Sequence, residues 1–358
     1  MKILPYINLP IILSSLWLLL IGILVIYSSS QILAFQQSLF VVVGFIGYFI
    51  VSQLNYKSFH ILVLPIYLFT LLSLLVVFML GVETRGVLRW IPIGSLNIQP
   101  SEFAKIALII FLADFWVKRM PTIKNILVSL LWTAPFVILI FRQPDLGSAL
   151  AIAAIWLGML FASGVSFKKV AVVILISILF IPVGLPLLED YQKLRIAGFL
   201  TPRSDPLGTG YNLIQSTIAI GSGQLWGRGL GQGTQSRLRF LPEYRTDFIF
   251  ASIAEEMGFV GSSIILLSYL FLLIYCLRVS WRASDSFGSL IAAGVSSQLL
   301  FQAFVNIGMN LGLLPITGIT LPLVSYGGSS LVATLMSLGF VSSVAKDEKK
   351  VDIDEGDG

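Results

Sequence analysis

The stretch FLPEYRTDFIFASIAEEMGFVG, residues 240–261, joins a polar, arginine-bearing segment to a long apolar run. Asp247 stands at the boundary between the two, where a carboxylate is reachable from water and partly desolvated. Glu255 and Glu256 follow, and on a helix that rises about 1.5 Å per residue they lie roughly 12 Å deeper. Because a charge inside a membrane segment is costly, it usually faces a cavity or a partner. The stretch therefore predicts a polar site that opens to one face of a membrane.

The composition of the whole chain is that of a membrane protein. Hydrophobic residues make up 56% of the chain and charged residues only 11%, whereas soluble domains carry about 25% charged residues. Several apolar runs exceed the roughly 18 residues that mark a spanning helix. The single cysteine, Cys276, excludes an intramolecular disulfide, and the single histidine, His60, excludes a histidine-rich metal site.

These runs predict an all-α, polytopic integral membrane protein with about ten transmembrane helices. Residues 1–345 are expected to form a single ten-helix membrane domain, with a large extracytoplasmic loop at 189–246 between the seventh and eighth helices. The charged tail 346–358 is predicted to be disordered. The predicted spans are 9–28, 36–54, 60–81, 102–117, 125–141, 147–163, 170–188, 247–277, 286–306 and 326–345.

Basic residues in the short loops predict the orientation. Lysine and arginine are frequent in the loops on the side of both chain ends and sparse on the other side, which holds Arg85, Arg89 and Arg142. The side richer in basic residues is normally cytoplasmic. Both termini are therefore expected in the cytoplasm, and the polar site is expected on the extracytoplasmic side of the cytoplasmic (inner) membrane.

The large loop breaks this charge pattern. It carries Lys193, Arg195, Arg203, Arg228, Arg237, Arg239 and Arg245. The positive-inside rule weakens for long loops, so it permits this charge without explaining it. An anionic ligand on the outer face would explain the charge, and attraction to anionic lipid headgroups is the alternative. Within the loop, 211–223 has roughly helical spacing and predicts an interfacial or re-entrant helix, followed by a glycine-rich stretch.

Two further polar clusters are expected on the same side. At 85–105, Glu102 lies in the first turn of a predicted helix, where the helix dipole favours an acid. Lys105 follows on the same face, and it either snorkels outward or points towards Glu255 or Glu256. At 142–149, Asp145 is predicted to cap the sixth span, or else to line the polar cavity.

The last cluster, 306–330, combines prolines and glycines with the polar run SYGGSS. Pro315 and Pro322, with Gly327 and Gly328, indicate either a broken helix that lines a cavity or close helix packing through small residues.

Four long motifs resemble those of the SEDS family (shape, elongation, division and sporulation) of cell-wall polymerases, and the form of the third favours the elongation members. They are RWIPIGSLNIQPSEFAK (89–105), RQPDLGSAL (142–150), GTQSRLRFLPEYRTDFIFASIAEEMGFVG (233–261) and NIGMNLGLLPITGITLPLVSYGGSS (306–330). The resemblance covers nearly the whole chain. It implies a peptidoglycan glycosyltransferase that polymerises lipid II into β-1,4-linked glycan strands at the outer face of the membrane. The implied partners are lipid II and the nascent strand, a class B penicillin-binding protein, the rod-shape elongation machinery and membrane lipids, with no nucleic acid.

Under this reading Asp247, which matches the family's key acid, is the general base that takes a proton from the acceptor hydroxyl. Its alternative role is capping of the helix that follows Thr246. The outer-face cations would stabilise the lipid diphosphate, and a divalent cation (Mg or Mn) would help, although no metal motif is visible. The residues expected to bind substrate are Arg89, Glu102, Lys105, Arg237, Arg239, Glu243, Arg245, Ser325 and Ser329. Those expected to shape the cavity or serve structural roles are Asp145, Glu255, Glu256, Pro315, Pro322, Gly327 and Gly328.

Two other functions fit the same features less well. A lipid II flippase would need polar residues along a path through the membrane, whereas the cytoplasmic half of this chain is apolar. A scaffold that only recruits a penicillin-binding protein would leave Asp247 and the outer arginines unexplained.

Overall fold

The computed structural model describes residues 7–84, 87–93, 96–184, 186, 189–238 and 240–356. Within these ranges seven helices are long and apolar enough to cross a membrane. They confirm an all-α, polytopic membrane protein, as predicted. These seven are α1 (Leu9–Ser29), α2 (Gln31–Gln53), α3 (Phe59–Leu80), α5 (Ile123–Arg142), α11 (Ile249–Arg282), α12 (Ser286–Asn310) and α13 (Gly328–Gly356).

The other predicted spans also coincide with helices. These are α4 (Pro100–Val117), α6 (Leu146–Ala162) and α7 (Phe167–Gly184). Helix α4 is almost wholly buried, because it packs against α3, α6 and α12. It carries Glu102, Lys105 and Asp114, so its sequence alone does not have the low charge of a typical membrane helix.

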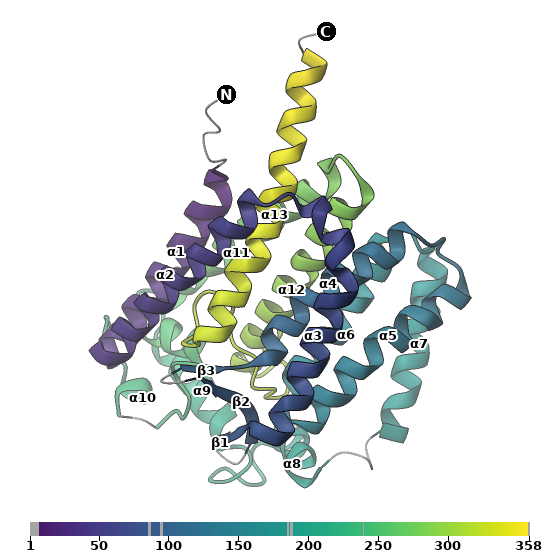
Figure 1. The fold of residues 1–358 in the computed structure, drawn as a ribbon. Coiled ribbons are helices and arrows are strands. Elements are labelled where there is room, and N and C mark those ends of the chain that lie inside the picture. The colour runs from purple at the N-terminus through teal and green to yellow at the C-terminus, as the bar shows by residue number, and fades with distance from the viewer. Residues whose placement is uncertain are drawn as a thin grey trace.

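The helices lie side by side in a bundle with two distinct ends (Figure 1). The start of α1 and the end of α13 lie at one end, which agrees with the prediction that both termini share a side. The opposite end carries the short helices of the large loop, α8 (Asp190–Leu200), α9 (Tyr211–Ser222) and α10 (Thr234–Arg237). The helix expected at 211–223 is therefore present as α9.

Two features differ from the sequence prediction. A small antiparallel sheet of β1 (Val82–Thr84), β2 (Val87–Ile93) and β3 (Leu96–Ile98) precedes α4. In addition, α13 continues as helix to Gly356, where a disordered tail was expected. Two acidic residues at the start of this tail contact the turns of neighbouring helices. Asp347 pairs with Lys57, and Glu348 lies 3.7 Å from Arg282.

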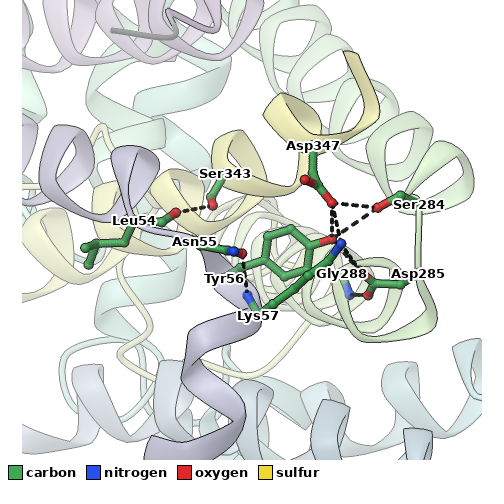
Figure 2. Close-up of polar contacts among 9 residues, drawn as sticks. All are labelled: Leu54, Asn55, Tyr56, Lys57, Ser284, Asp285, Gly288, Ser343 and Asp347. Atoms are coloured by element: carbon green, nitrogen blue, oxygen red, sulfur yellow. Dashed lines mark hydrogen bonds and ion pairs between the residues drawn. The ribbon is translucent and has the colours of Figure 1, made fainter. Parts of the chain in front are cut away.

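Figure 2 shows how Asp347 joins three segments that are distant in sequence. The Lys57 ammonium lies 2.6 Å from Asp347 and 3.3 Å from Asp285. The Tyr56 hydroxyl donates to Asp285, and the Ser284 hydroxyl donates to Asp347 over 2.9 Å. This Lys57 cluster connects the turn between α2 and α3, the turn between α11 and α12, and the C-terminal half of α13.

At the other end of the bundle, α11 is interrupted. Gly258 has a φ of 68°, and the backbone groups on either side of it lack their helical partners. The glycine-rich loop after α9 supplies them. The backbone N–H groups of Arg228 and Gly229 donate to the backbone carbonyl oxygens of Glu255 and Glu256, respectively, over 3.0 Å. Since lipid offers no substitute for such partners, this loop makes the break tolerable in a membrane helix.

The close fit of the loop depends on Gly227. Its φ is +83°, and a β-carbon added there would lie 2.2 Å from the Glu256 carbonyl oxygen. We expect Gly227→Ala to lower the free energy of unfolding by about 1–3 kcal/mol, because of the left-handed backbone and the clash. Thermal unfolding of the purified protein in detergent measures this.

Gly221→Ala is the matched control. Gly221 lies in α9, and nothing lies within 4 Å of its added β-carbon. Alanine there should stabilise the helix by up to about 1 kcal/mol. Equal unfolding temperatures for the two variants would contradict the role given to the loop.

The Lys57 cluster makes stability depend on pH. Burial alone raises the pKa of the Asp285 carboxyl, but hydrogen bonds from the Tyr56 hydroxyl, a backbone N–H and the Lys57 ammonium outweigh it. The pKa therefore lies below its ordinary value of 3.8. A lowered folded-state pKa stabilises the protein above pH 3.8, and this contribution is lost as the pH falls through the folded-state pKa.

Asp285→Asn tests this linkage, because asparagine can still cap α12 at this position but carries no charge. We expect the variant to unfold at a lower temperature than the parent protein at pH 6, and the difference to shrink as the pH falls below about 4. A difference that stays constant from pH 6 to pH 3 would show that the charge of Asp285 contributes nothing.

Candidate active site

Asp247 lies on a short segment that leads into α11, and α12 holds the backbone of that segment. The side-chain amides of Asn306 and Asn310 donate to the Asp247 carbonyl oxygen over 2.9 and 3.0 Å. The Asn310 side-chain oxygen accepts from the Ala251 N–H. The N-cap of α11 is Phe248, which makes no side-chain capping bond. Asp247 is thus not the capping residue that the alternative interpretation required.

The residues just before Asp247 are held equally firmly. Glu243 has a φ of +50°, a left-handed conformation that costs a non-glycine residue about 1–3 kcal/mol. Its carboxylate accepts from the Thr246 hydroxyl over 3.0 Å. The Ser325 hydroxyl donates to the Thr246 carbonyl, and the Tyr326 N–H donates to the Arg245 carbonyl. The turn is therefore fixed from the side of the 311–327 segment.

That segment between α12 and α13 is not helical. Of the two interpretations of its prolines and glycines, the broken helix is therefore confirmed. Pro322 accepts a hydrogen bond from the buried Tyr269 hydroxyl, and Pro315 lies next to a residue of the cavity wall, Ile316. Gly327 donates to Gln37, while Gly328 packs against the Phe40 ring, so close packing contributes as well.

A cavity of ≈ 160 Å³ lies beside Asp247. Its wall comes from α8, from the start of α9 and the turn before it, from the turn before α11, and from the broken segment. It holds two carboxylates, one guanidinium and the side chains of an asparagine and a threonine. The lining residues are Arg195, Gly198, Phe199, Thr209, Asn212, Leu213, Glu243, Asp247, Phe248 and Ile316.

Arg195 and Asp247, which both line the cavity, approach the same point beside Gly318. A β-carbon added to Gly318, whose φ is +78°, would lie 3.6 Å from a carboxylate oxygen of Asp247 and 3.8 Å from a guanidinium nitrogen of Arg195. In the sequence Arg195 is only one of seven basic residues in a loop. Arg195 differs from the other basic residues of the loop because it lies in α8. The capping-box residues Glu189 and Gln192 could have predicted the start of this helix.

Both predictions for Lys105 are wrong, because its partner is Glu102 on the same helix. Its ammonium lies 2.7 Å from Glu102, and both side chains are buried. Lys105 therefore neither snorkels outward nor reaches Glu255 or Glu256. Their spacing of three residues on α4 brings the two charges together, so each neutralises the other inside the bundle.

Glu255 and Glu256 instead bind neighbouring segments to α11. The fully buried Glu255 carboxylate accepts from the N–H groups of Gln235 and Ser236 over 2.8 and 3.1 Å, at the start of α10. Glu256 accepts from the Ser28 hydroxyl of α1 over 2.9 Å. These two acids hold the loop and α1 in place and lie outside the cavity lining.

The arginines expected to bind diphosphate have protein partners. Arg89 donates to the carbonyls of Gln143 and Pro144, and Arg237 donates to the Gly231 carbonyl. Arg245 donates twice to Ser29 and lies over a tyrosine ring. None of these three lines the described cavity. Arg239 lies outside the described residues.

The remaining candidates make hydrogen bonds within the protein. Asp145 caps α6 as predicted, because it accepts from the Ser148 N–H and hydroxyl over 3.1 and 2.8 Å. It also accepts from the Gln99 side chain. Ser329 accepts from the Gln99 N–H and so connects α13 to the start of α4. Among the described residues, no group of three or more His, Cys, Asp or Glu side chains is placed to hold a metal ion.

Comparison with known proteins agrees with this architecture. Residues 8–350 match the family model for FtsW, RodA and SpoVE, described as cell cycle proteins. The chain is 43% identical over 282 residues to the peptidoglycan glycosyltransferase MrdB of Escherichia coli, covering 78% of this chain and 76% of that protein. It is 37% identical to the stage V sporulation protein E of Bacillus subtilis, covering 95% and 97%.

Solved structures show the same fold. A chain from a study of polymerization and crosslinking by a peptidoglycan synthase complex superposes with a TM-score of 0.82 at 33% identity, covering 94% of this chain and 97% of that one. The rod shape determining protein RodA of Thermus thermophilus superposes with a TM-score of 0.73 at 28% identity, covering 95% and 97%.

Proposed function

Because the chain belongs to the FtsW, RodA and SpoVE family it is a peptidoglycan glycosyltransferase, and we propose that it polymerises lipid II with the Asp247 carboxylate as general base. The observation that carries this proposal is the position of Asp247. Its side chain lines a polar cavity while its backbone is fixed by two asparagines of α12. A base held in one geometry needs no reorganisation as the reaction proceeds.

The proposed step joins two lipid-linked glycans. Asp247 takes the proton of the acceptor sugar's 4-hydroxyl, whose oxygen attacks the anomeric carbon of the growing strand. The bond from that carbon to the diphosphate breaks, and its electron pair leaves with the lipid diphosphate. Attack opposite an α-linked leaving group gives a β-1,4 linkage. The product strand remains attached to the lipid of the acceptor.

We further propose that the chain crosses the cytoplasmic membrane ten times with its cavity on the outer side, as needed for cell elongation. The basic residues beside the two chain ends favour a cytoplasmic position for that end of the bundle. The cavity then lies at the extracytoplasmic end, together with α8 and α9 (Figure 1). Lipid II displayed in the outer leaflet would reach it from the side of the bilayer.

The proposed protein partners are a class B penicillin-binding protein and the rod-shape elongation machinery. One structural relative comes from a peptidoglycan synthase complex that coordinates polymerization and crosslinking. A polymerase of this family needs such a transpeptidase nearby, because uncrosslinked strands add no strength to the wall.

A divalent cation, Mg²⁺ or Mn²⁺, fits the proposed reaction. Mg²⁺ is commonly held by one or two carboxylates plus substrate phosphates, so it needs no protein-only cluster of acids. Glu243 and Asp247 supply two carboxylates in one cavity. The ion would neutralise charge on the diphosphate when bound.

Asp247→Asn tests the proposed base. We expect glycan polymer on a gel with labelled lipid II to fall by at least about 100-fold, because the amide cannot accept the proton. Asp190→Asn is the matched control, since Asp190 is a fully solvated carboxylate of the same loop with a 98% exposed side chain. Undiminished polymer from Asp247→Asn would remove it from the mechanism, and lipid transport into vesicles without polymer would favour a flippase.

Chelation tests the cation. We expect EDTA to reduce polymer formation and added Mg²⁺ or Mn²⁺ to restore it, because the diphosphate leaves more readily when its charge is neutralised. Unchanged rates after chelation, with residual metal checked by elemental analysis, would exclude a metal requirement.

A further inference from the structure

We propose that Arg195 binds the diphosphate of the lipid-linked donor and stabilises the charge that develops on it as it leaves. The proposal rests on the proposed function and assigns the leaving-group site within the same cavity. Its first support is the shared position of Arg195 and Asp247. Both charged groups lie within 4 Å of the point where a β-carbon on Gly318 would sit.

The structure places Arg195 on a rigid support. Helix α8 starts with a capping box, in which the Glu189 N–H donates to the Gln192 side chain over 3.0 Å. Further along α8, Gly198 packs so closely on the next turn that an added β-carbon would lie 2.5 Å from the Thr209 carbonyl oxygen. The Asp205 carboxylate accepts from the N–H of Thr209 and so closes that turn. Arg195 is therefore held on a short, closed α8–α9 unit.

The α8–α9 unit is in turn bound to the helices that carry Asp247. The Ser216 hydroxyl of α9 donates to the Asn310 carbonyl over 2.8 Å. Asn310 also holds the Asp247 backbone. Ala219 of α9 also packs in one buried cluster with Ala251 and with Phe248, which lines the cavity. The guanidinium and the carboxylate are thus positioned by one connected set of contacts.

The size of the cavity indicates which part of the substrate it takes. Its ≈ 160 Å³ is well below the roughly 300–1,000 Å³ of pockets that enclose whole small ligands. It can therefore hold only a part of a lipid-linked disaccharide-peptide, of the size of the reacting centre. Since the general base acts at that centre and the attack is in line, the diphosphate lies across the anomeric carbon from the base, several ångströms from Asp247 and inside the same site.

The chemistry of the lining then selects Arg195. It is the one cationic side chain among the residues that line the described cavity. The guanidinium offers a rigid fork of donors that matches phosphate oxygens, which an ammonium group does not. As the carbon–oxygen bond breaks, its electron pair moves to the diphosphate oxygen, and the positive fork stabilises that charge.

Binding of undecaprenyl diphosphate, the leaving group itself, tests this assignment. We expect Arg195→Gln to weaken its binding by roughly 10- to 100-fold, and Arg195→Lys by less, because lysine keeps the charge without the fork. Lys193→Gln is the control, since Lys193 lies on the same helix, pairs with Asp190 and does not line the cavity. Binding is measured on full-length protein in nanodiscs, in an Asp247→Asn background that requires no turnover.

The outcomes separate this proposal from the proposed function. Arg195→Gln binding undecaprenyl diphosphate as tightly as Lys193→Gln would overturn the diphosphate site, even if polymerisation were lost. If Arg195→Gln unfolds, the Arg195→Lys variant is used in its place. Unweakened binding by Arg195→Lys would overturn the diphosphate site. If the pH profile of polymerisation, measured with Asp247 intact, also shifted, Arg195 would be a positioning residue for Asp247. Full polymerisation by Asp247→Asn would instead show that Asp247 is not the general base. The assignment of the diphosphate to Arg195 would then stand or fall with the binding result alone.

Discussion

A bilayer offers no water to backbone groups, and this constraint explains why the polar parts of the protein lie where they do. Helix α11 breaks at Gly258, and the loop at 224–229 must fill the break with its own N–H and C=O groups. That requirement draws the large loop into the helix bundle. Because the same loop joins α9 to the turn before α11, filling the break also fixes the region around the cavity.

The second consequence of low polarity is that buried charges find partners. Glu102 neutralises Lys105 inside α4, and Glu255 accepts hydrogen bonds from the start of α10. These acids resemble catalytic candidates in the sequence because charge in a membrane helix is rare. In the structure they secure the frame, while Asp247 lines the cavity with its backbone carbonyl held by Asn306 and Asn310.

This division of roles suits a glycosyltransferase. The proposed base and the proposed leaving-group site must keep a fixed separation, since small displacements of reacting groups slow a reaction greatly. The left-handed conformation of Glu243 in the cavity wall shows that the surroundings impose this geometry on the chain. The Lys57 cluster at the other end secures the helix ends far from the chemistry (Figure 2).

The sequence by itself determined the class of fold, most of the membrane helices and the helix at 211–223, because hydropathy and helical spacing are local properties of a chain. It did not determine which charges meet. The spacing of Glu102 and Lys105 was visible, yet their mutual pairing depended on how deeply α4 is buried. In the sequence Arg195 does not differ from the other loop arginines, and Arg245 was predicted to bind phosphate, whereas in the structure Arg245 donates to Ser29. Only the packing of α8, α9 and the broken segment around α11 decided these partners, since they come from residues far apart in the chain.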